Sequence, residues 1–287
     1  LGMHLAFVQQ FRFAALEWVK PEQAATTASV VLLGGLVAAW VGPEMVMLGK
    51  ELFAQTFSGV FVLLALSHCL LLVLLNIIPF AQSVNQNQVE SRRPLKELLM
   101  APALGAAMAS GAVAYGVMSL IMTATPVSMT EIQDFPLAQT KTVIQSHIMA
   151  MFLPSLITPL LLRWISIINL LMLGLVAMVA AISIAIFDQG YWGYWSALVC
   201  LGLGWNFLFV GGTTLLTQSY QPEDSFRIQA VNEFCVFSTQ ALTSLMAGWL
   251  VFSYGWFAIN LLAIPLLILA LAMLARWTMA GSAQSSR

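Results

Sequence analysis

The architecture of this chain can be inferred from residues 21–45, PEQAATTASVVLLGGLVAAWVGPEM, in a segment that continues to Met47. Pro21 and Glu22 favour a helix N-terminus, because proline loses no hydrogen bond in the first turn and glutamate meets the positive end of the helix dipole. Residues 24–41 carry no charge. At about 1.5 Å per residue, this uncharged run approaches the ~30 Å thickness of the hydrocarbon core of a bilayer. The stretch therefore predicts a membrane-spanning helix.

Small residues recur four positions apart on this helix and are followed at once by a proline. They are Gly34, Ala38, Gly42 and Pro43. Such spacing leaves a smooth groove along one face, in which a second helix can approach closely. We expect this face to pack against a neighbouring helix that moves, with these residues acting as a hinge or seal.

The composition is that of a polytopic membrane protein. The chain is 60% hydrophobic and 8% charged, with a mean hydropathy of +0.88, whereas ordinary globular domains are about a quarter charged. The net charge of −1 and the lack of a basic patch argue against nucleic acid as a partner. Cys69, Cys200 and Cys235 lie in separate apolar runs, which predicts buried small apolar side chains and no disulfide.

No sequence motif indicates a cofactor, a metal site or an ATP-binding site. The chain has no glycine-rich phosphate loop, no cluster of cysteine and histidine, and no readable Ser-His-Asp arrangement. We therefore expect a protein that is not an enzyme. No signal peptide is visible, and the chain starts with leucine inside an apolar run, from which we expect that an N-terminal part is missing.

Nine apolar segments predict an all-α, polytopic transmembrane helical bundle. The predicted spans are residues 1–19, 21–47, 53–78, 98–123, 142–162, 165–187, 194–218, 228–252 and 256–275. A loop with Glu131, Asp134 and Lys141 precedes the fifth span. We predict four parts: the remainder of an N-terminal lobe (1–80), a cytoplasmic linker (81–97), a six-helix C-terminal lobe (98–276) and a cytoplasmic tail (277–287).

The basic residues predict the orientation in the membrane. If the loop after the first span is cytoplasmic, nine of the eleven basic residues fall on the cytoplasmic side, as the positive-inside rule requires. These are Arg12, Lys20, Arg92, Arg93, Lys96, Arg163, Arg227, Arg276 and Arg287. Lys50 and Lys141 fall outside. The expected orientation places the C-terminus in the cytoplasm.

Two loops resemble each other across an interval of six spans. Pro21-Glu22 opens the second span, and Pro222-Glu223 precedes the eighth. Together with the long linker after the third span, this echo suggests two six-helix halves, the first lacking about three helices. Paired halves around a central site are a common plan of transporters.

With these features the sequence resembles the major facilitator superfamily. Residues 34–43 resemble the glycine-proline motif in the fifth helix of its antiporters, and residues 82–96 resemble the loop between the halves. Arg163 resembles a remnant of the loop between helices eight and nine. Residues 229–249, with QAVNEFCVF and SLMAGW, are similar to the eleventh helix of bacterial members. The resemblance implies that the chain corresponds to helices four to twelve of a twelve-helix, two-lobed transporter in the bacterial inner membrane.

Ionisable side chains within the spans are candidates for the transport pathway, because each costs roughly 2.5 to 3.5 kcal/mol at mid-helix. Glu233 could bind a proton or pair with Arg12, but it could also be a carboxylate stabilised by the helix dipole near the surface. Arg12 could anchor substrate or extend to the lipid headgroups. Histidine titrates in the range useful for proton coupling. The resemblance places His147 on a cavity-facing helix and His68 on a peripheral one.

Uncharged polar side chains could line a cavity or form hydrogen bonds between helices. The set comprises Tyr115, Ser119, Asn206, Thr213, Thr214, Gln218, Asn232 and Gln240. Pro154 and Pro159 permit kinks in the fifth span. Glycines of the fourth and seventh spans predict close packing: Gly105, Gly111, Gly116, Gly202, Gly204, Gly211 and Gly212. Tryptophans near span ends predict an interfacial belt: Trp192, Trp195, Trp249 and Trp256.

These features favour a secondary active transporter that moves a small molecule by alternating access. Proton coupling is expected because Glu233 or His147 could titrate. The expected direction, efflux, is what the resemblance alone implies. The partners of the transporter would be the lipid bilayer, the substrate and protons. One alternative is a membrane-embedded enzyme acting on lipid-like substrates, which would need acidic or histidine residues clustered at a cytoplasmic edge. Another is a membrane scaffold or receptor that does not transport.

Overall fold

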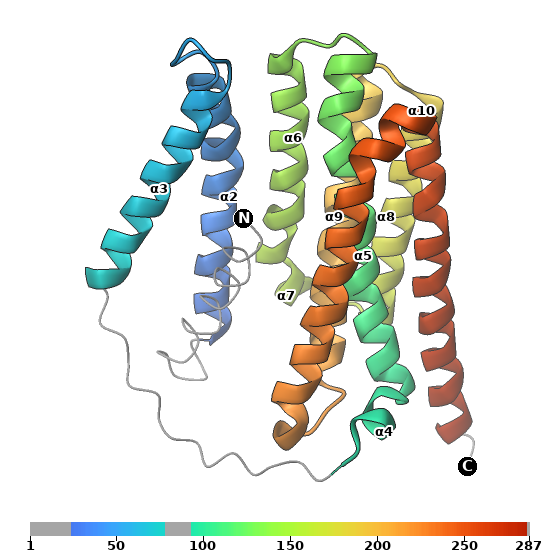
Figure 1. Cartoon of the computed structure of the whole chain (residues 1–287). Coiled ribbons are helices and arrows are strands. Elements are labelled where there is room, and N and C mark those ends of the chain that lie inside the picture. The colour runs from blue at the N-terminus through green and yellow to red at the C-terminus, as the bar shows by residue number, and fades with distance from the viewer. Residues whose placement is uncertain (1–23, 78–92, 286–287) are drawn as a thin grey trace. The chain divides into compact units, whose positions relative to one another are not determined.

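The computed structural model describes residues 24–77 and 93–285, and the chain forms two compact units, residues 1–87 and 88–287 (Figure 1). Every regular element in the described residues is a helix. The predicted all-α helical bundle is thereby confirmed. Five of the described helices are long and apolar enough to cross a membrane, and one of these contains two arms. The first predicted span and Arg12 lie outside the described residues.

The described part of the N-terminal unit is a pair of helices, α2 (Ala24–Gly49) and α3 (Ser58–Ile77). They approach closely at the connecting turn, where a Cβ atom on Gly59 would lie 2.4 Å from the Gly49 carbonyl oxygen. The small residues Gly34, Ala38 and Gly42 are exposed on α2, and a Cβ atom on either glycine would meet nothing within 4 Å. Their predicted partner helix is therefore not α3.

The C-terminal unit is a bundle of longer helices joined by short turns. Its elements are α4 (Leu95–Leu99), α5 (Pro102–Val127), the π-helical turn η2 (Ser128–Ile132), α6 (Leu137–Phe152), the 3₁₀ turn η3 (Leu153–Leu156), α7 (Thr158–Leu161), α8 (Ile167–Phe187), α9 (Tyr191–Thr217), the 3₁₀ turn η4 (Pro222–Asp224) and α10 (Ser225–Ser285). Helix α10 is two arms that meet at Gly255, whose φ of +78° is accessible to glycine and strained for other residues (Figure 1).

The helix boundaries follow the predicted spans with two corrections. Helix α10 continues to Ser285, beyond the predicted end of the last span at residue 275, and so includes most of the predicted tail. Helix α6 begins at Leu137, so Lys141 lies in a helix and not in a loop. Pro136 is in an extended conformation and supplies a natural start, and the residues after it are compatible with a helix. The expected interruption of this span is present, because α6 ends at Phe152 and a 3₁₀ turn containing Pro154 leads to α7.

Helix α5 forms the centre of the C-terminal unit and is buried along most of its length. Glycines bring its neighbours close. A Cβ atom on Gly116 would lie 2.8 Å from Thr239 of α10, and one on Gly212 of α9 would lie 3.1 Å from the Ala107 carbonyl oxygen of α5. The predicted close-packing role of the glycines on α5 and α9 is confirmed.

Two predictions about apolar side chains are partly wrong. Cys69 is exposed on α3 rather than buried, and Cys200 and Cys235 are half-buried. Trp256 does not belong to an interfacial belt, because it is buried and its indole N–H donates to the Ala185 carbonyl oxygen at 2.9 Å. Both differences arise because hydropathy alone does not distinguish a helix face turned to lipid from one turned to protein. Trp192 and Trp249 are exposed, as a belt requires.

Candidate functional site

Aromatic rings from four helical segments gather inside the C-terminal unit. Tyr115 of α5 makes edge-to-face contacts, with centroid distances of 5.2, 5.3 and 5.8 Å, to Trp205 and Phe209 of α9 and Phe237 of α10. Phe152 of α6 meets Trp205 at 6.0 Å. Trp205 and Phe209 are stacked at 5.0 Å with their planes 17° apart. We call Tyr115, Phe152, Trp205, Phe209 and Phe237 the ring cluster.

The five rings of the ring cluster differ in how deeply they are buried. Tyr115 and Trp205 are buried, at 8% and 4% exposure, whereas Phe152, Phe209 and Phe237 are half-buried. The inner rings therefore support outer rings whose surface is partly open. The Trp205 indole nitrogen is buried and has no hydrogen-bond acceptor among the described residues.

Asn206, next to Trp205 on α9, is held by the interrupted span. Its side-chain amide donates to the Met151 carbonyl oxygen at 2.6 Å and also to the Ser155 hydroxyl, while Thr158 donates to its carbonyl oxygen at 3.4 Å. Pro154 lies inside this segment and is buried. Pro159 lies in α7. Asn206 thus ties α9 to both sides of the helix break, and its predicted place in the transport pathway stays a prediction.

His147 is fully buried on α6 and faces α9. Its Nδ1 lies 2.8 Å from the Leu198 carbonyl oxygen. Because a carbonyl oxygen only accepts, Nδ1 carries the hydrogen and Nε2 has a free lone pair. Nε2 has no partner among the described residues. His68 instead bonds within its own helix, to the Leu64 carbonyl oxygen at 2.7 Å.

The other predicted pathway residues lie along the contact between α5 and the first arm of α10. Tyr115 meets Phe237, and Thr123 lies 3.3 Å from Ser244 through their hydroxyl oxygens. Ser119 and Gln240 lie between these two contacts in their respective helices. Ser119 is buried and Gln240 is half-buried.

The acidic candidate lies one helical turn before Phe237. Glu233 is half-buried and is 3.5 Å from the side-chain amide of Asn232, which is itself buried. The structure therefore places Tyr115, Ser119 and Gln240 along one helix–helix contact, with Asn232 and Glu233 about one turn before Phe237 on the same arm of α10. In the described part of the chain, no three His, Cys, Asp or Glu side chains are grouped so that they could hold a metal ion.

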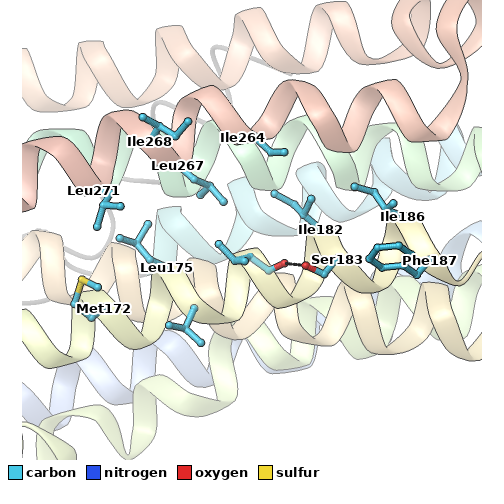
Figure 2. A pocket seen from close by; sticks show the side chains of 12 residues that line it. Met172, Leu175, Ile182, Ser183, Ile186, Phe187, Ile264, Leu267, Ile268 and Leu271 are labelled. Carbon is cyan, nitrogen blue, oxygen red and sulfur yellow. Dashed lines mark hydrogen bonds between the residues drawn. The ribbon is translucent and has the colours of Figure 1, made fainter.

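A separate apolar groove of about 470 Å³ lies between α8 and the second arm of α10 (Figure 2). Its lining is aliphatic and aromatic except for Ser183, whose hydroxyl donates to the Val179 carbonyl oxygen at 2.8 Å. Ser183 has thus already used its one donor, and among the lining residues of this groove it alone has a polar side chain with which to orient a polar substrate. Its composition suits contact with lipid chains, and the ring cluster is the better candidate for a substrate site.

Basic residues fasten the end of the linker to the C-terminal unit. Arg93 forms an ion pair with Asp224, which is buried in the turn between α9 and α10. Arg227 donates to the Arg93 carbonyl oxygen at 2.9 Å, and Arg276 donates to the Met100 carbonyl oxygen at 3.2 Å. These contacts involve four of the basic and acidic residues that the sequence places at one end of the bundle.

Sequence reasoning missed most of the ring cluster. Tyr115 was predicted as a pathway residue for its hydroxyl, but Phe152, Trp205, Phe209 and Phe237 are bulky apolar residues like many others in a membrane span. One signal could have been used. Trp205 and Phe209 are four apart, so they lie on one helix face in a region otherwise rich in glycine and leucine.

Comparisons with known proteins define the class. No protein-family model matches the chain. It is 35% identical over 278 residues to the riboflavin transporter RfnT of Brucella anthropi, covering 95% of this chain and 69% of that protein. It is 30% identical over 302 residues to the uncharacterised MFS-type transporter YddS of Bacillus subtilis, covering 93% and 67%. A third relative, the uncharacterised MFS-type transporter YdeG of Bacillus subtilis, is 31% identical over 148 residues, or 51% of this chain and 34% of that protein.

The chain belongs to the major facilitator superfamily of membrane transporters. The family predicted from the sequence is confirmed, and the protein is an integral membrane protein of the secondary-transporter class.

Proposed function

We propose that this protein transports riboflavin, or a closely related planar heteroaromatic compound, across the bacterial inner membrane by alternating access. The observation that carries the proposal is 35% identity to a riboflavin transporter over 95% of the chain. The ring cluster supports it, because aromatic side chains bind planar ligands through stacked and edge-to-face contacts.

The proposal includes two lobes that rock about a midplane site, with residues 1–80 and 98–276 contributing one lobe each and residues 81–97 joining them on the cytoplasmic side. The distribution of basic residues supports a cytoplasmic tail at 277–287. Gly34, Ala38, Gly42 and Pro43 would act where the lobes move against each other.

Coupling to protons and net efflux are further parts of the proposal. The resemblance of residues 34–43 to an antiporter motif supports efflux. Glu233 is the favoured proton carrier, since it is a half-buried carboxylate beside the ring cluster. His147 is the second candidate, because its buried Nε2 can accept a proton.

Flux of labelled riboflavin tests the proposed substrate. The protein encoded by the complete reading frame would be reconstituted in proteoliposomes, and a pH gradient would be imposed in either direction. We expect saturable riboflavin movement against its own gradient, abolished by a protonophore, in the direction opposite to proton movement. Absence of flux for riboflavin and related heteroaromatic compounds would contradict the proposed function. Flux of riboflavin in the same direction as the protons would contradict only the proposed efflux.

Glu233→Gln tests the coupling site. The amide cannot carry a proton, so we expect loss of gradient-driven flux but retention of riboflavin exchange between the two sides, which needs no net proton movement. Glu131→Gln is the matched control, because Glu131 is exposed in the turn after α5. If Glu233→Gln left the dependence on the pH gradient unchanged, the same measurement would be made with His147→Gln.

A further inference from the structure

The ring cluster gathers five large rings among helices that also approach through small residues. A Cβ atom on Gly116 of α5 would lie 2.8 Å from Thr239 of α10, and one on Gly202 of α9 would lie 2.6 Å from the His147 carbonyl oxygen of α6. The rings therefore fill the space between close contacts of α5, α6, α9 and α10. Five aromatic side chains in one such space offer stacked and edge-to-face surfaces for a planar ligand.

Trp205 supplies a second, independent observation. Trp195 donates its indole N–H to the Ser146 hydroxyl, and Trp256 donates to the Ala185 carbonyl oxygen, both at 2.9 Å. Trp205 is as buried as Trp256, yet its N–H meets no acceptor in the described residues. An N–H group left without an acceptor is costly within a membrane, where water does not compensate. An acceptor on a bound ligand would remove this cost.

The exposure of the rings defines how a ligand could reach them. The half-buried rings of Phe152, Phe209 and Phe237 surround the buried Tyr115 and Trp205. A planar ligand can therefore pack on the outer phenylalanines. An indole N–H points along the plane of its ring, so the acceptor must lie at the edge of the indole and not above its face. Because the Trp205 nitrogen is itself buried, a ligand reaches it only when the surrounding side chains move, as alternating access allows.

We propose that the ring cluster is the subsite that binds the ring system of the transported compound, with Trp205 donating its N–H to a carbonyl oxygen or ring nitrogen at the edge of that ring. The inference rests on the proposed function and assigns its substrate contact to particular residues. It requires a ligand that combines an extended aromatic plane with acceptors on its rim. A flavin ring has both, whereas a sugar or an aliphatic amine has no aromatic plane.

Binding to the purified full-length protein tests the subsite with two probes, riboflavin and lumiflavin, which has the same isoalloxazine ring with a methyl group in place of the ribityl chain. Trp205→Phe keeps a ring and removes the N–H, so we expect Kd to rise about fivefold to tenfold for both probes. Phe237→Leu removes a stacking surface and should raise Kd by about threefold to tenfold.

The matched controls are Trp192→Phe on the same helix as Trp205 and Phe234→Leu on the same helix as Phe237. Both side chains are largely exposed, at 69% and 73%, so their Kd values should stay within about twofold of the unchanged protein. Quenching of tryptophan fluorescence by riboflavin provides a second readout, which should fall more in Trp205→Phe than in Trp192→Phe. Thermal unfolding of each variant shows whether it is folded.

The outcomes separate the two proposals. If riboflavin is bound and transported but Trp205→Phe and Phe237→Leu behave like their controls, the subsite is overturned while the proposed function stands. If both variants weaken the binding of riboflavin but not of lumiflavin, the ring-binding assignment is likewise overturned. If the unchanged protein binds neither probe and moves no riboflavin, the proposed function and the subsite fall together.

Discussion

Asn206 shows how hydrogen bonds can give a polar residue in a membrane span a structural role. From the sequence it is equally a cavity-lining residue or a partner between helices. In the folded unit its amide reaches the backbone of Met151 and the hydroxyl of Ser155, on the two sides of a helix end. A helix interrupted at Pro154 leaves backbone groups without their usual partners, and such groups need replacements in a membrane.

We therefore predict that Asn206→Ala destabilises the protein by about 1–3 kcal/mol, because the substitution removes hydrogen bonds in a buried site. The midpoint of thermal unfolding in detergent measures this effect. Asn169→Ala is the control, since Asn169 is exposed near the start of α8. An unchanged midpoint combined with a raised KM for substrate would show instead that Asn206 acts mainly in the transport pathway.

The sequence could identify polar residues at the site but not the surface they surround. Tyr115, Ser119, Asn232, Glu233 and Gln240 stand out because polar groups are rare in membrane spans. The phenylalanines and Trp205 do not stand out, since aromatic residues also face lipid. Which aromatic rings meet depends on the rotation of each helix about its axis, and in a span that is apolar all round the hydrophobic period does not fix this rotation.

At the scale of the helix, small residues determine where two backbones come together. The positions of the spans followed from hydropathy and from charged or proline-containing turns, and the glycines of α5 and α9 marked close contacts correctly. The start of α6 was less predictable, because Lys141 suggested a loop while its helix was set by Pro136. The sequence also did not show which residues bring two helices together. Helices α2 and α3 meet through Gly49 and Gly59 rather than through the small residues spaced four apart.

Gly202→Ala tests the contact between α6 and α9. Its Cβ atom would lie 2.6 Å from the His147 carbonyl oxygen and 2.9 Å from Ala150, so the helices would have to separate. We expect a destabilisation of about 1–3 kcal/mol, as for other overpacked sites. Gly248→Ala is the matched control, because a Cβ atom there meets nothing within 4 Å. That control should be neutral or stabilising by up to about 1 kcal/mol, and equal midpoints for the two variants would contradict the packing argument.

The ion pair that attaches the linker predicts that replacing its arginine destabilises the protein more than replacing its aspartate. The Asp224 side chain is 1% exposed, whereas that of Arg93 is 49% exposed. Arg93→Ala leaves a buried carboxylate without its guanidinium, while Asp224→Asn leaves an arginine that can turn to water. We expect Arg93→Ala to lower stability by about 2 kcal/mol or more, and Asp224→Asn to lower it less. Thermal unfolding measures both, with the exposed Arg163→Ala as control; a larger effect of Asp224→Asn would contradict the prediction.

At the scale of the whole molecule, the two units differ in how well their exposed surfaces suit contact with lipid. The C-terminal unit buries α5 completely enough to form a core, and its outward faces are apolar, as contact with lipid requires. On α2, by contrast, the small residues Gly34, Ala38 and Gly42 are exposed. Small residues gain nothing from contact with lipid, whereas a helix that packs on them comes close enough for extensive van der Waals contact.

We therefore predict that Gly34→Leu combined with Gly42→Leu lowers riboflavin flux by at least about tenfold without unfolding the protein. A Cβ atom at either position meets nothing within 4 Å in the described structure, so α2 itself should tolerate the larger side chains. If these residues lie where the lobes move against each other, two leucines would keep the opposing helix at a distance and block one state of the transport cycle. Val37→Leu is the matched control, because Val37 is 63% exposed on the same helix outside the small-residue row.

The Gly34→Leu and Gly42→Leu variant also distinguishes a contact that changes during transport from one that is fixed. A leucine pair that merely disturbed a fixed interface should lower the thermal midpoint and reduce exchange and gradient-driven flux in proportion to the loss of folded protein. A pair that blocks one state should leave the midpoint near its original value and reduce flux far more than binding, because the substrate can still bind in the state that remains accessible. Flux equal to that of Val37→Leu would show that this face of α2 has no part in transport.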